Sequence, residues 1–288
     1  MKIYLNGKLV EANEAKISVF DRSYLFGEGL FETLRAYKGE VPFLDKHLAR
    51  MEWSATFLGL PIPHPREIAE AVKKTLEANG LKEARIKIIL SAQGESFVPM
   101  MVGDGLTINL VIICDDYRAY AKMDYEKGVD LAMLHSIRSD VAPTSTIKST
   151  SWISKMIARR EFLERDVFDG ILMDAHGFIT ECTMGNLFWV QSEKIYTTPV
   201  SIGLLSGITR QLVIDLVKEN GYEFKEKIIK PNELLKADEI FMTNSLVEVL
   251  PVCEIDGEAI GNGEVGAMTK ILMQAYKDRI DEEIASNR

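Results

Sequence analysis

Apolar and polar residues alternate in several short runs of the chain, and this pattern predicts β-strands. Runs at residues 2–5 and 8–10 flank Asn6 and Gly7, a pair that tolerates positive φ and is a strong hairpin signal. A second hairpin is predicted from residues 31–35 and 41–44. Further strands are predicted at residues 85–90, 106–113, 129–134, 170–173, 178–180, 187–190, 195–197, 223–229 and 239–243.

Other stretches carry apolar residues every three or four positions, which predicts amphipathic helices. Asp45 is a candidate cap for a helix over residues 47–60, and Pro65 begins another that ends at Asn79 and Gly80. A third helix is predicted over residues 151–165. The side chains expected to face inward are Leu48, Met51, Trp53 and Phe57 in the first helix, and Ile153, Met156, Ile157 and Leu163 in the third.

Strands and helices interleave in both halves of the chain, which indicates an α+β or α/β fold. The length of 288 residues suits one large domain or two modest ones. Residues 117–127 form a polar stretch that we interpret as a linker. The sequence therefore predicts a small N-terminal α/β domain at residues 1–116 and a larger C-terminal domain at residues 128–288.

The composition narrows the classes of protein to consider. Hydrophobic residues make up 47 % of the chain and charged residues 27 %, which is typical of a soluble globular protein. The net charge of −9 argues against a nucleic-acid partner, because phosphate binding needs a basic face. No apolar run is long enough to span a membrane. The three cysteines are scattered, as expected for reduced thiols, so we expect a cytoplasmic protein.

The sequence lacks the short motifs of several common enzyme classes. It has no Gly-x-Ser-x-Gly elbow, no phosphate-binding Gly-x-x-x-x-Gly-Lys loop and no His-Glu-x-x-His motif. Gly27 and Gly29 lack the third glycine of a dinucleotide-binding fingerprint, because Glu32 occupies that place. The four histidines lie apart without ligand spacing. We therefore expect no metal site.

Three positions are candidates for chemistry, although each also has an ordinary structural explanation. Lys148 stands just before a predicted helix, where burial at a strand end would lower the pKa of a nucleophilic amine; most lysines, however, are solvated surface charges. Glu181 follows a short hairpin and could equally be a turn carboxylate. Residues 207–210 begin a helix, whose first N–H groups bind anions well but need only an ordinary cap.

Several separated segments together resemble one known family. The segment from Thr146 to Trp189 contains Lys148, the run Thr180-Glu181-Cys182 and the run Asn186-Leu187-Phe188-Trp189, and Leu205-Ser206-Gly207-Ile208-Thr209-Arg210 follows. This combination resembles the pyridoxal-phosphate (PLP) enzymes of aminotransferase class IV. That family contains branched-chain aminotransferases, D-amino acid aminotransferases and aminodeoxychorismate lyases. The resemblance extends over nearly the whole chain.

The resemblance implies a role for each matching residue. Lys148 is the implied catalytic lysine, which forms the Schiff base with PLP and moves the substrate Cα proton. Glu181 is implied to lie beside the pyridine nitrogen, where a carboxylate keeps that nitrogen protonated. The other residues implied to bind the cofactor are Arg50, Ser245, Ile208 and Thr209 at its phosphate, Leu205 against its ring, and the neighbouring Asn186 and Gly207.

The family also implies an architecture and a reaction. Its fold is the two-domain PLP fold type IV, with a small N-terminal α/β domain, a larger C-terminal domain containing a pseudo-barrel, and PLP between them. A homodimer is implied, because a neighbour's loop completes the pocket. The expected reaction is ping-pong transamination between an amino acid and a 2-oxo acid, with small-molecule substrates and neither nucleic acid nor membrane as a partner.

The choice of reaction within the family depends on a few positions. Trp152, Lys87 and the turn at Asn244 depart from the branched-chain pattern and are similar to the lyase, whereas the C-terminal segment and Glu248 resemble aminotransferases. We expect transfer of an amino group from a branched-chain or other hydrophobic L-amino acid to 2-oxoglutarate, with aminodeoxychorismate lyase activity as the alternative. Transamination of D-amino acids or (R)-amines is less favoured. A non-catalytic binding module is disfavoured, because such a protein has no need of the candidate lysine. The candidate substrate-binding residues, which could equally be core residues, are Phe26, Phe31, Lys87, Asn244 and Leu246.

Overall fold

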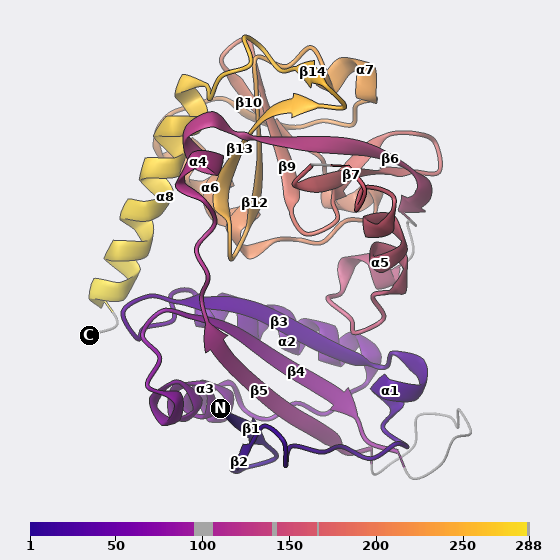
Figure 1. The fold of residues 1–288 in the computed structure, drawn as a ribbon, viewed down its shortest axis with the longest axis vertical. Helices are drawn as coiled ribbons and strands as arrows, with labels where there is room; N and C mark the ends of the chain where they lie inside the picture. Colours follow the sequence, from indigo (N-terminus) through magenta and orange to yellow (C-terminus); the bar gives the residue numbers. More distant parts are fainter. Residues whose placement is uncertain (95–105, 140–142, 166, 287–288) are drawn as a thin grey trace. The chain divides into compact units, whose positions relative to one another are not determined.

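The computed structural model describes residues 1–94, 106–139, 143–165 and 167–286, which form an α+β fold as the sequence predicted (Figure 1). Contacts within the chain divide it into two compact units. The first unit comprises Met1–Arg118, Ile147–Trp152 and Glu283–Arg288, and the second comprises Ala119–Thr146 and Ile153–Glu282.

The bounds of these units differ in two respects from the expected division at residues 117–127. Most of the expected linker lies in the second unit, where α4 (Lys122–Lys127) packs near β13 (Glu248–Ile255) and the Tyr125 hydroxyl donates to the Val247 carbonyl at 3.2 Å. The segment Ile147–Trp152 returns to the first unit. Neither feature is visible in the sequence, because both depend on pairing between residues far apart in the chain.

The first unit is built on a five-stranded sheet with the order β2-β1-β5-β4-β3, in which every neighbouring pair is antiparallel. The hairpin predicted around Asn6 and Gly7 is confirmed, since both residues have positive φ between β1 and β2. The strands are β1 (Lys2–Leu5), β2 (Lys8–Glu11), β3 (Gly29–Ala36), β4 (Ala84–Ala92) and β5 (Ile108–Asp116).

Two helices pack near this sheet: α2 (Leu44–Leu58) lies near β3, and α3 (Pro65–Asn79) lies near β1 and β5. Leu48 and Met51 of α2 are buried as expected, whereas Trp53 and Phe57 are about half exposed and stack on each other. The strand predicted at residues 41–44 is wrong. Only a bridge between Tyr37 and Glu40 forms there, and α2 begins directly after Phe43, whose φ of 58° is left-handed.

The second unit contains a nine-stranded mixed sheet with the order β11-β10-β9-β12-β13-β6-β7-β8, and β14 pairs with β13. Its two ends meet, because the N–H of Ile179 on β8 donates to the carbonyl of Ile229, just after β11, at 2.9 Å. The sheet is therefore curled (Figure 1). The strands not yet given are β6 (Val129–Ser139), β7 (Asp169–Asp174), β8 (Ile179–Cys182), β9 (Asn186–Gln191), β10 (Lys194–Thr197), β11 (Phe224–Glu226), β12 (Glu239–Asn244) and β14 (Glu258–Ala259).

Helix α5 (Ile153–Arg160) corrects part of the prediction for residues 151–165. It is shorter than expected and packs near β6 and β7 through Ala158, with Phe162 following it into the same cluster. The side chains predicted to face inward are instead exposed in the single chain: Ile153, Met156, Ile157 and Leu163 are 65 %, 45 %, 41 % and 67 % exposed.

The remaining helical segments belong to both units. The carboxylate of Glu239 on β12 accepts the N–H groups of Met268 at 3.0 Å and Thr269 at 2.7 Å, so it caps the start of α8. Among the residues described, no helix combines the length and apolarity that crossing a membrane requires. These segments are α1 (Arg22–Phe26) in the first unit, then the short helices η1 (Pro143–Thr146) and η2 (Val200–Ile202), α6 (Ile208–Glu219), α7 (Pro231–Leu234) and α8 (Ala267–Ser286).

Candidate active site

The backbone around Lys148 is fixed to the edge of β3. The carbonyl of Lys148 accepts the N–H of Phe31 at 2.9 Å, and the N–H of Thr150 donates to the carbonyl of Gly29 at 2.9 Å. The residues between these pairs form an antiparallel bridge. A side chain at Gly29 would place its Cβ 2.9 Å from the Leu90 carbonyl oxygen, so only glycine fits this packed edge. The candidate lysine therefore lies on a rigid element of the first unit.

The Phe31 ring is the centre of a cluster in the first unit. The Nζ of Lys148 lies 4.8 Å from the ring centroid and the Nζ of Lys87 lies 4.7 Å from it, both within cation–π range. Trp152 packs edge-on to the ring, with the centroids 6.2 Å apart. Partial burial and the nearby charge of Arg85 lower the pKa of Lys87. The structure thus brings three predicted residues together and adds Trp152, which the sequence did not assign to the site.

Arg50 is held by a buried carboxylate on the face of β3 that carries Leu30 and Leu34. Glu32 is 1 % exposed and accepts Arg50 Nε at 2.8 Å on one oxygen and Arg50 Nη2 at 2.6 Å on the other. His47 Nδ1 lies 2.8 Å from the same carboxylate. His47 and Arg50 are three residues apart, so both project from one side of α2. The predicted arginine is therefore oriented by two residues that the sequence did not assign to the site.

The charges in this triad are strongly coupled. Burial alone would raise the pKa of Glu32, but the charge of Arg50 and the hydrogen bonds from His47 and Arg50 outweigh it and lower that pKa to about 2. Burial lowers the pKa of His47, and the positive charges of Arg50 and Lys148 add to this effect despite the Glu32 carboxylate. At neutral pH the triad therefore contains an ionised Glu32, a charged Arg50 and a neutral His47, whose Nδ1–H donates.

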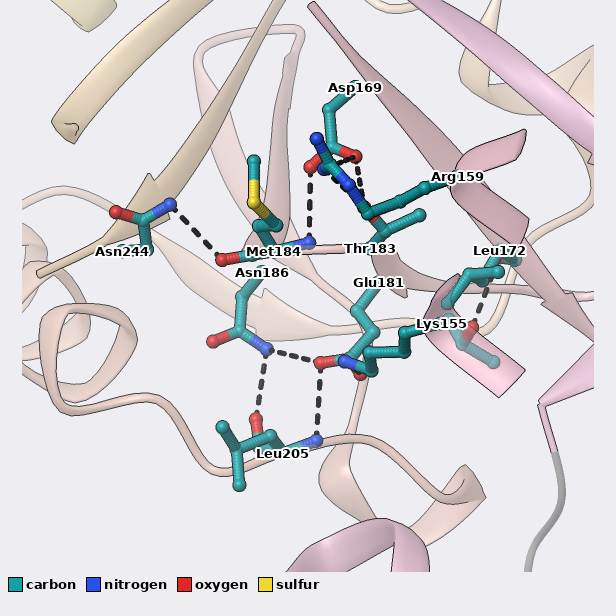
Figure 2. Close-up of polar contacts among 11 residues, drawn as sticks. Lys155, Arg159, Asp169, Leu172, Glu181, Thr183, Met184, Asn186, Leu205 and Asn244 are labelled. Atoms are coloured by element: carbon teal, nitrogen blue, oxygen red, sulfur yellow. Dashed lines mark hydrogen bonds and ion pairs between the residues drawn. The ribbon is translucent and has the colours of Figure 1, made fainter. Parts of the chain in front are cut away.

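In the second unit, Glu181 on β8 is the centre of a network of polar contacts (Figure 2). Its Oε1 accepts Lys155 Nζ at 2.8 Å, and its Oε2 accepts the N–H of Leu205 at 3.2 Å and Asn186 Nδ2 at 3.4 Å. Asn186 Nδ2 also donates to the Leu205 carbonyl at 2.9 Å. The structure brings the three predicted residues Glu181, Asn186 and Leu205 together.

A second carboxylate supports the turn between β8 and β9. Asp169 on β7 is fully buried and accepts the Thr183 hydroxyl on one oxygen and the N–H of Met184 at 3.1 Å on the other. Arg159 Nη1 lies 3.8 Å from Asp169 Oδ1 (Figure 2). Burial raises the pKa of Asp169, against the hydrogen bonds it accepts and the charge of Arg159. This network holds in place the turn that connects Glu181 to Asn186.

The start of α6 carries three more of the predicted residues. Gly207 is the residue before the helix and provides no side-chain cap, so the first N–H groups of Ile208 and Thr209 point out of the helix end. A Cβ on Gly207 would lie only 2.1 Å from Asn186 Oδ1. Thr209 is buried, and its hydroxyl lies 3.4 Å from that of Tyr276. An uncapped helix end of this kind attracts anions.

The turn between β12 and β13 carries the last predicted group. Asn244 Oδ1 accepts the N–H groups of Leu246 at 2.8 Å and Val247 at 2.9 Å, while its Nδ2 donates to the Met184 carbonyl at 3.1 Å. Asn244 is thus a structural residue of this turn, on which Ser245 also lies. The hydroxyl of Thr243, just before it, is buried and has no hydrogen-bond partner among the residues described.

The predicted site residues fall into two groups, one in each unit. Arg50, Lys148, Phe31 and Lys87 lie in the first unit, as does Phe26, which lies beside Arg22 and is 43 % exposed. The group in the second unit consists of Glu181, Asn186, Leu205, Gly207, Ile208, Thr209, Asn244, Ser245 and Leu246.

Comparison with known proteins defines the family. Residues 29–255 match the family described as amino-transferase class IV. A putative branched-chain-amino-acid aminotransferase of Methanocaldococcus jannaschii is 36 % identical over 96 % of each chain, and a D-alanine aminotransferase of Bacillus licheniformis is 32 % identical over 99 % of each. The crystal structure of an Escherichia coli branched-chain amino acid aminotransferase has a TM-score of 0.90 and 29 % identity, covering 97 % of this chain and 94 % of that one.

This chain therefore belongs to the class IV aminotransferase family, a family of PLP-dependent enzymes, and it has the fold of that family. The family agrees with what the sequence motifs indicated, and the α+β fold agrees with the predicted interleaving of strands and helices.

Proposed function

We propose that this enzyme moves the amino group of a branched-chain or other hydrophobic L-amino acid to 2-oxoglutarate by a ping-pong mechanism. The observation that carries the proposal is the Phe31 cluster, in which one apolar ring is flanked by the ammonium groups of Lys148 and Lys87. An apolar surface beside two cations suits a substrate that combines an apolar side chain with a carboxylate. The similarity to proteins named as branched-chain aminotransferases supports the same substrate class.

The residues present fit PLP, judged by their donors and acceptors. Glu181 is a buried carboxylate with three donors among the described residues, and a carboxylate has about four acceptor positions, which leaves one for a further N–H. That N–H would come from the ring nitrogen. The uncapped start of α6 and the guanidinium of Arg50 suit a phosphate. We therefore assign the phosphate to Arg50, Ile208, Thr209 and Ser245, with Gly207 allowing close approach and Leu205 packing against the ring.

When bound, PLP withdraws electrons from the substrate α-carbon. In this proposal Lys148 would hold the cofactor covalently, and its Nζ, once the substrate amine had taken its place, would take the proton from the substrate α-carbon as a general base. The hydrogen bonds of its backbone with β3 fix the point from which that side chain extends. Lys87 would bind the substrate carboxylate, while Phe31, Leu246 and Phe26 would contact its side chain.

We also propose that the protein is a homodimer and that it is located in the cytoplasm, which is a reducing compartment. The three cysteines are free and buried, as suits such a compartment.

Aminodeoxychorismate lyase activity is the second candidate. The observation that favours it is the turn Asn244-Ser245-Leu246, whose sequence is similar to that of the lyases and whose conformation is fixed by Asn244. The lyase would release pyruvate and 4-aminobenzoate instead of transferring an amino group between two acids.

A half-reaction screen tests these candidates. The purified PLP form is mixed separately with L-leucine, L-glutamate, D-alanine and 4-amino-4-deoxychorismate, while the absorbance of the bound cofactor is followed. We expect conversion to the pyridoxamine form with L-leucine and L-glutamate, and no conversion in the matched Lys148→Ala variant. Pyruvate release from aminodeoxychorismate without a response to L-leucine would replace the transaminase with the lyase. Conversion by D-alanine alone would contradict the proposed stereochemistry.

A further inference from the structure

Lys155 is a charged side chain that contacts the proposed cofactor site without belonging to the set of residues assigned above. It projects from the first turn of α5 and is 28 % exposed, while its partner Glu181 is 8 % exposed. Its Nζ lies 2.8 Å from Glu181 Oε1 (Figure 2). A cation this close to a buried carboxylate changes what that carboxylate can do chemically.

We propose that Lys155 is a positioning residue that fixes one oxygen of Glu181 and places a positive charge beside it, so that a proton shared with the cofactor ring nitrogen stays on the nitrogen. This inference rests on the proposed function, in which Glu181 is the partner of that nitrogen. It concerns Lys155 alone, because the other donors to Glu181 are uncharged.

The three donors described for Glu181 are distributed over its two carboxylate oxygens. Oε2 receives two neutral donors, the N–H of Leu205 and Nδ2 of Asn186, and Oε1 receives the ammonium group of Lys155. Neutral donors orient the carboxylate but compensate little of the cost of burying its charge, whereas a charged donor compensates far more.

The position of the proton follows from distance. The ammonium group of Lys155 forms a hydrogen bond with the Glu181 carboxylate. A base that binds to another position of this carboxylate therefore lies further from the ammonium group than the carboxylate does. Coulomb energy falls with distance, so Lys155 favours the state with an ionised Glu181 and a protonated base over the state with both neutral. A protonated ring nitrogen is the form that accepts electrons from the substrate.

A merely structural role for Lys155 would consist of attaching α5 to the sheet, and Arg159 provides the control for that role. Arg159 lies one turn further along α5 and contacts Thr183 at 3.3 Å and Asp169 at 3.8 Å on the same hairpin. It attaches the same helix to neighbouring strands, but through Thr183 and Asp169 rather than through Glu181. Arg159→Met therefore weakens the attachment of α5 while leaving the Lys155–Glu181 pair.

The experiment is ¹⁵N NMR of the holoenzyme reconstituted with PLP labelled at the ring nitrogen, since this chemical shift distinguishes a protonated from an unprotonated nitrogen. We expect a protonated nitrogen in the wild type, Lys155→Arg and Arg159→Met. In Lys155→Met and Lys155→Gln we expect the resonance to move towards the unprotonated position at the same pH, and the cofactor dissociation constant to rise by on the order of tenfold. Using both Met and Gln guards against one variant failing to fold.

The outcomes separate the two proposals. A shift in Lys155→Met and Lys155→Gln that Lys155→Arg restores supports the inference. An unchanged resonance in the first two variants overturns it, as does an equal shift in Arg159→Met, which would assign the effect to loosening of α5. Failure of the wild type to bind PLP at all would instead overturn the proposed function.

Discussion

Replacing Glu32 with glutamine tests how much the buried Glu32–Arg50–His47 triad stabilises the fold. The pKa of Glu32 is lowered from 4.5 to about 2, and each pKa unit corresponds to about 1.4 kcal/mol, so the ionised form contributes about 3 kcal/mol. Breaking a buried ion pair by removing one partner typically costs about 3–5 kcal/mol, because the remaining charge stays buried. The two estimates agree, and we expect Glu32→Gln to lower the free energy of unfolding by about 3 kcal/mol at pH 7.

The sign of the pH dependence follows from the direction of this shift. A carboxyl whose pKa is lowered on folding contributes its full stability above its unfolded pKa, near 4.5, and loses that contribution as the pH falls towards 2. The wild type should therefore lose about 3 kcal/mol from this site over that range. Glu32→Gln should lack this part of the acid dependence, because glutamine does not titrate.

Urea denaturation of the cofactor-free protein measures both effects, with the midpoint read at a constant m-value. The matched control is Asp115→Asn, which removes one charge from the Arg85–Asp115 pair, at 3.7 Å and more than half exposed on both sides. Exposed pairs contribute about 0–1 kcal/mol, so the control should change little. A loss below about 1 kcal/mol in Glu32→Gln, or an unchanged acid profile, would show that the triad does not stabilise the fold in the way described.

Two further substitutions test the proposed site. Gly207→Ala places a Cβ 2.1 Å from Asn186 Oδ1, so we expect weaker PLP binding in a fluorescence titration, and unchanged affinity would contradict the tight approach of these segments. Lys87→Met should raise the KM for the amino acid on the order of tenfold, because one charge-assisted contact with the substrate is lost. The same substitution should leave the urea midpoint nearly unchanged, because Lys87 lies at an exposed position of β4. A KM equal to that of the wild type would remove Lys87 from carboxylate binding.

Local sequence signals predicted the parts of the fold that local interactions determine. Asn6 and Gly7 produced the first hairpin because positive φ at both positions is a property of those residues themselves. The strand predicted at residues 41–44 was wrong, because the left-handed backbone of Phe43 ends the extended run just before α2. The positions where D-amino acid aminotransferases are expected to carry an Arg-x-His pair are Phe97-Val98-Pro99 in this sequence, and they lie outside the described residues.

Periodicity identified apolar faces but not what covers them. Ile153, Met156 and Ile157 have helical spacing, yet they face outward from α5 in the single chain, and only Ala158 is buried. Hydrophobic spacing specifies that residues share a face, whereas burial depends on which strands lie opposite. Apart from Ala158, the contacts that attach α5 to the sheet are polar, through Lys155 and Arg159, and no apolar pattern predicts them.

The site could be predicted only as a set of residue types and motifs. Lys148 and Phe31 are more than a hundred residues apart, and only the pairing of residues 148–150 with β3 makes them neighbours. Glu32 and His47 were missed, although a glutamate between Leu30 and Leu34 on one face of a strand was a usable signal. A charge at a core position needs a partner, and the sequence provides Arg50 on the following helix.

The attachment of residues 148–150 to β3 also constrains how the protein is made. During synthesis, the strands of the first unit emerge from the ribosome well before this segment does. Because β3 forms an end of its sheet, its outer edge remains unpaired until residues 148–150 have been synthesised. The first unit therefore cannot complete its folding as an autonomous N-terminal piece. A protein truncated at residue 118 would expose the same edge and should aggregate, so the segment that carries the candidate lysine also finishes the sheet on which it lies.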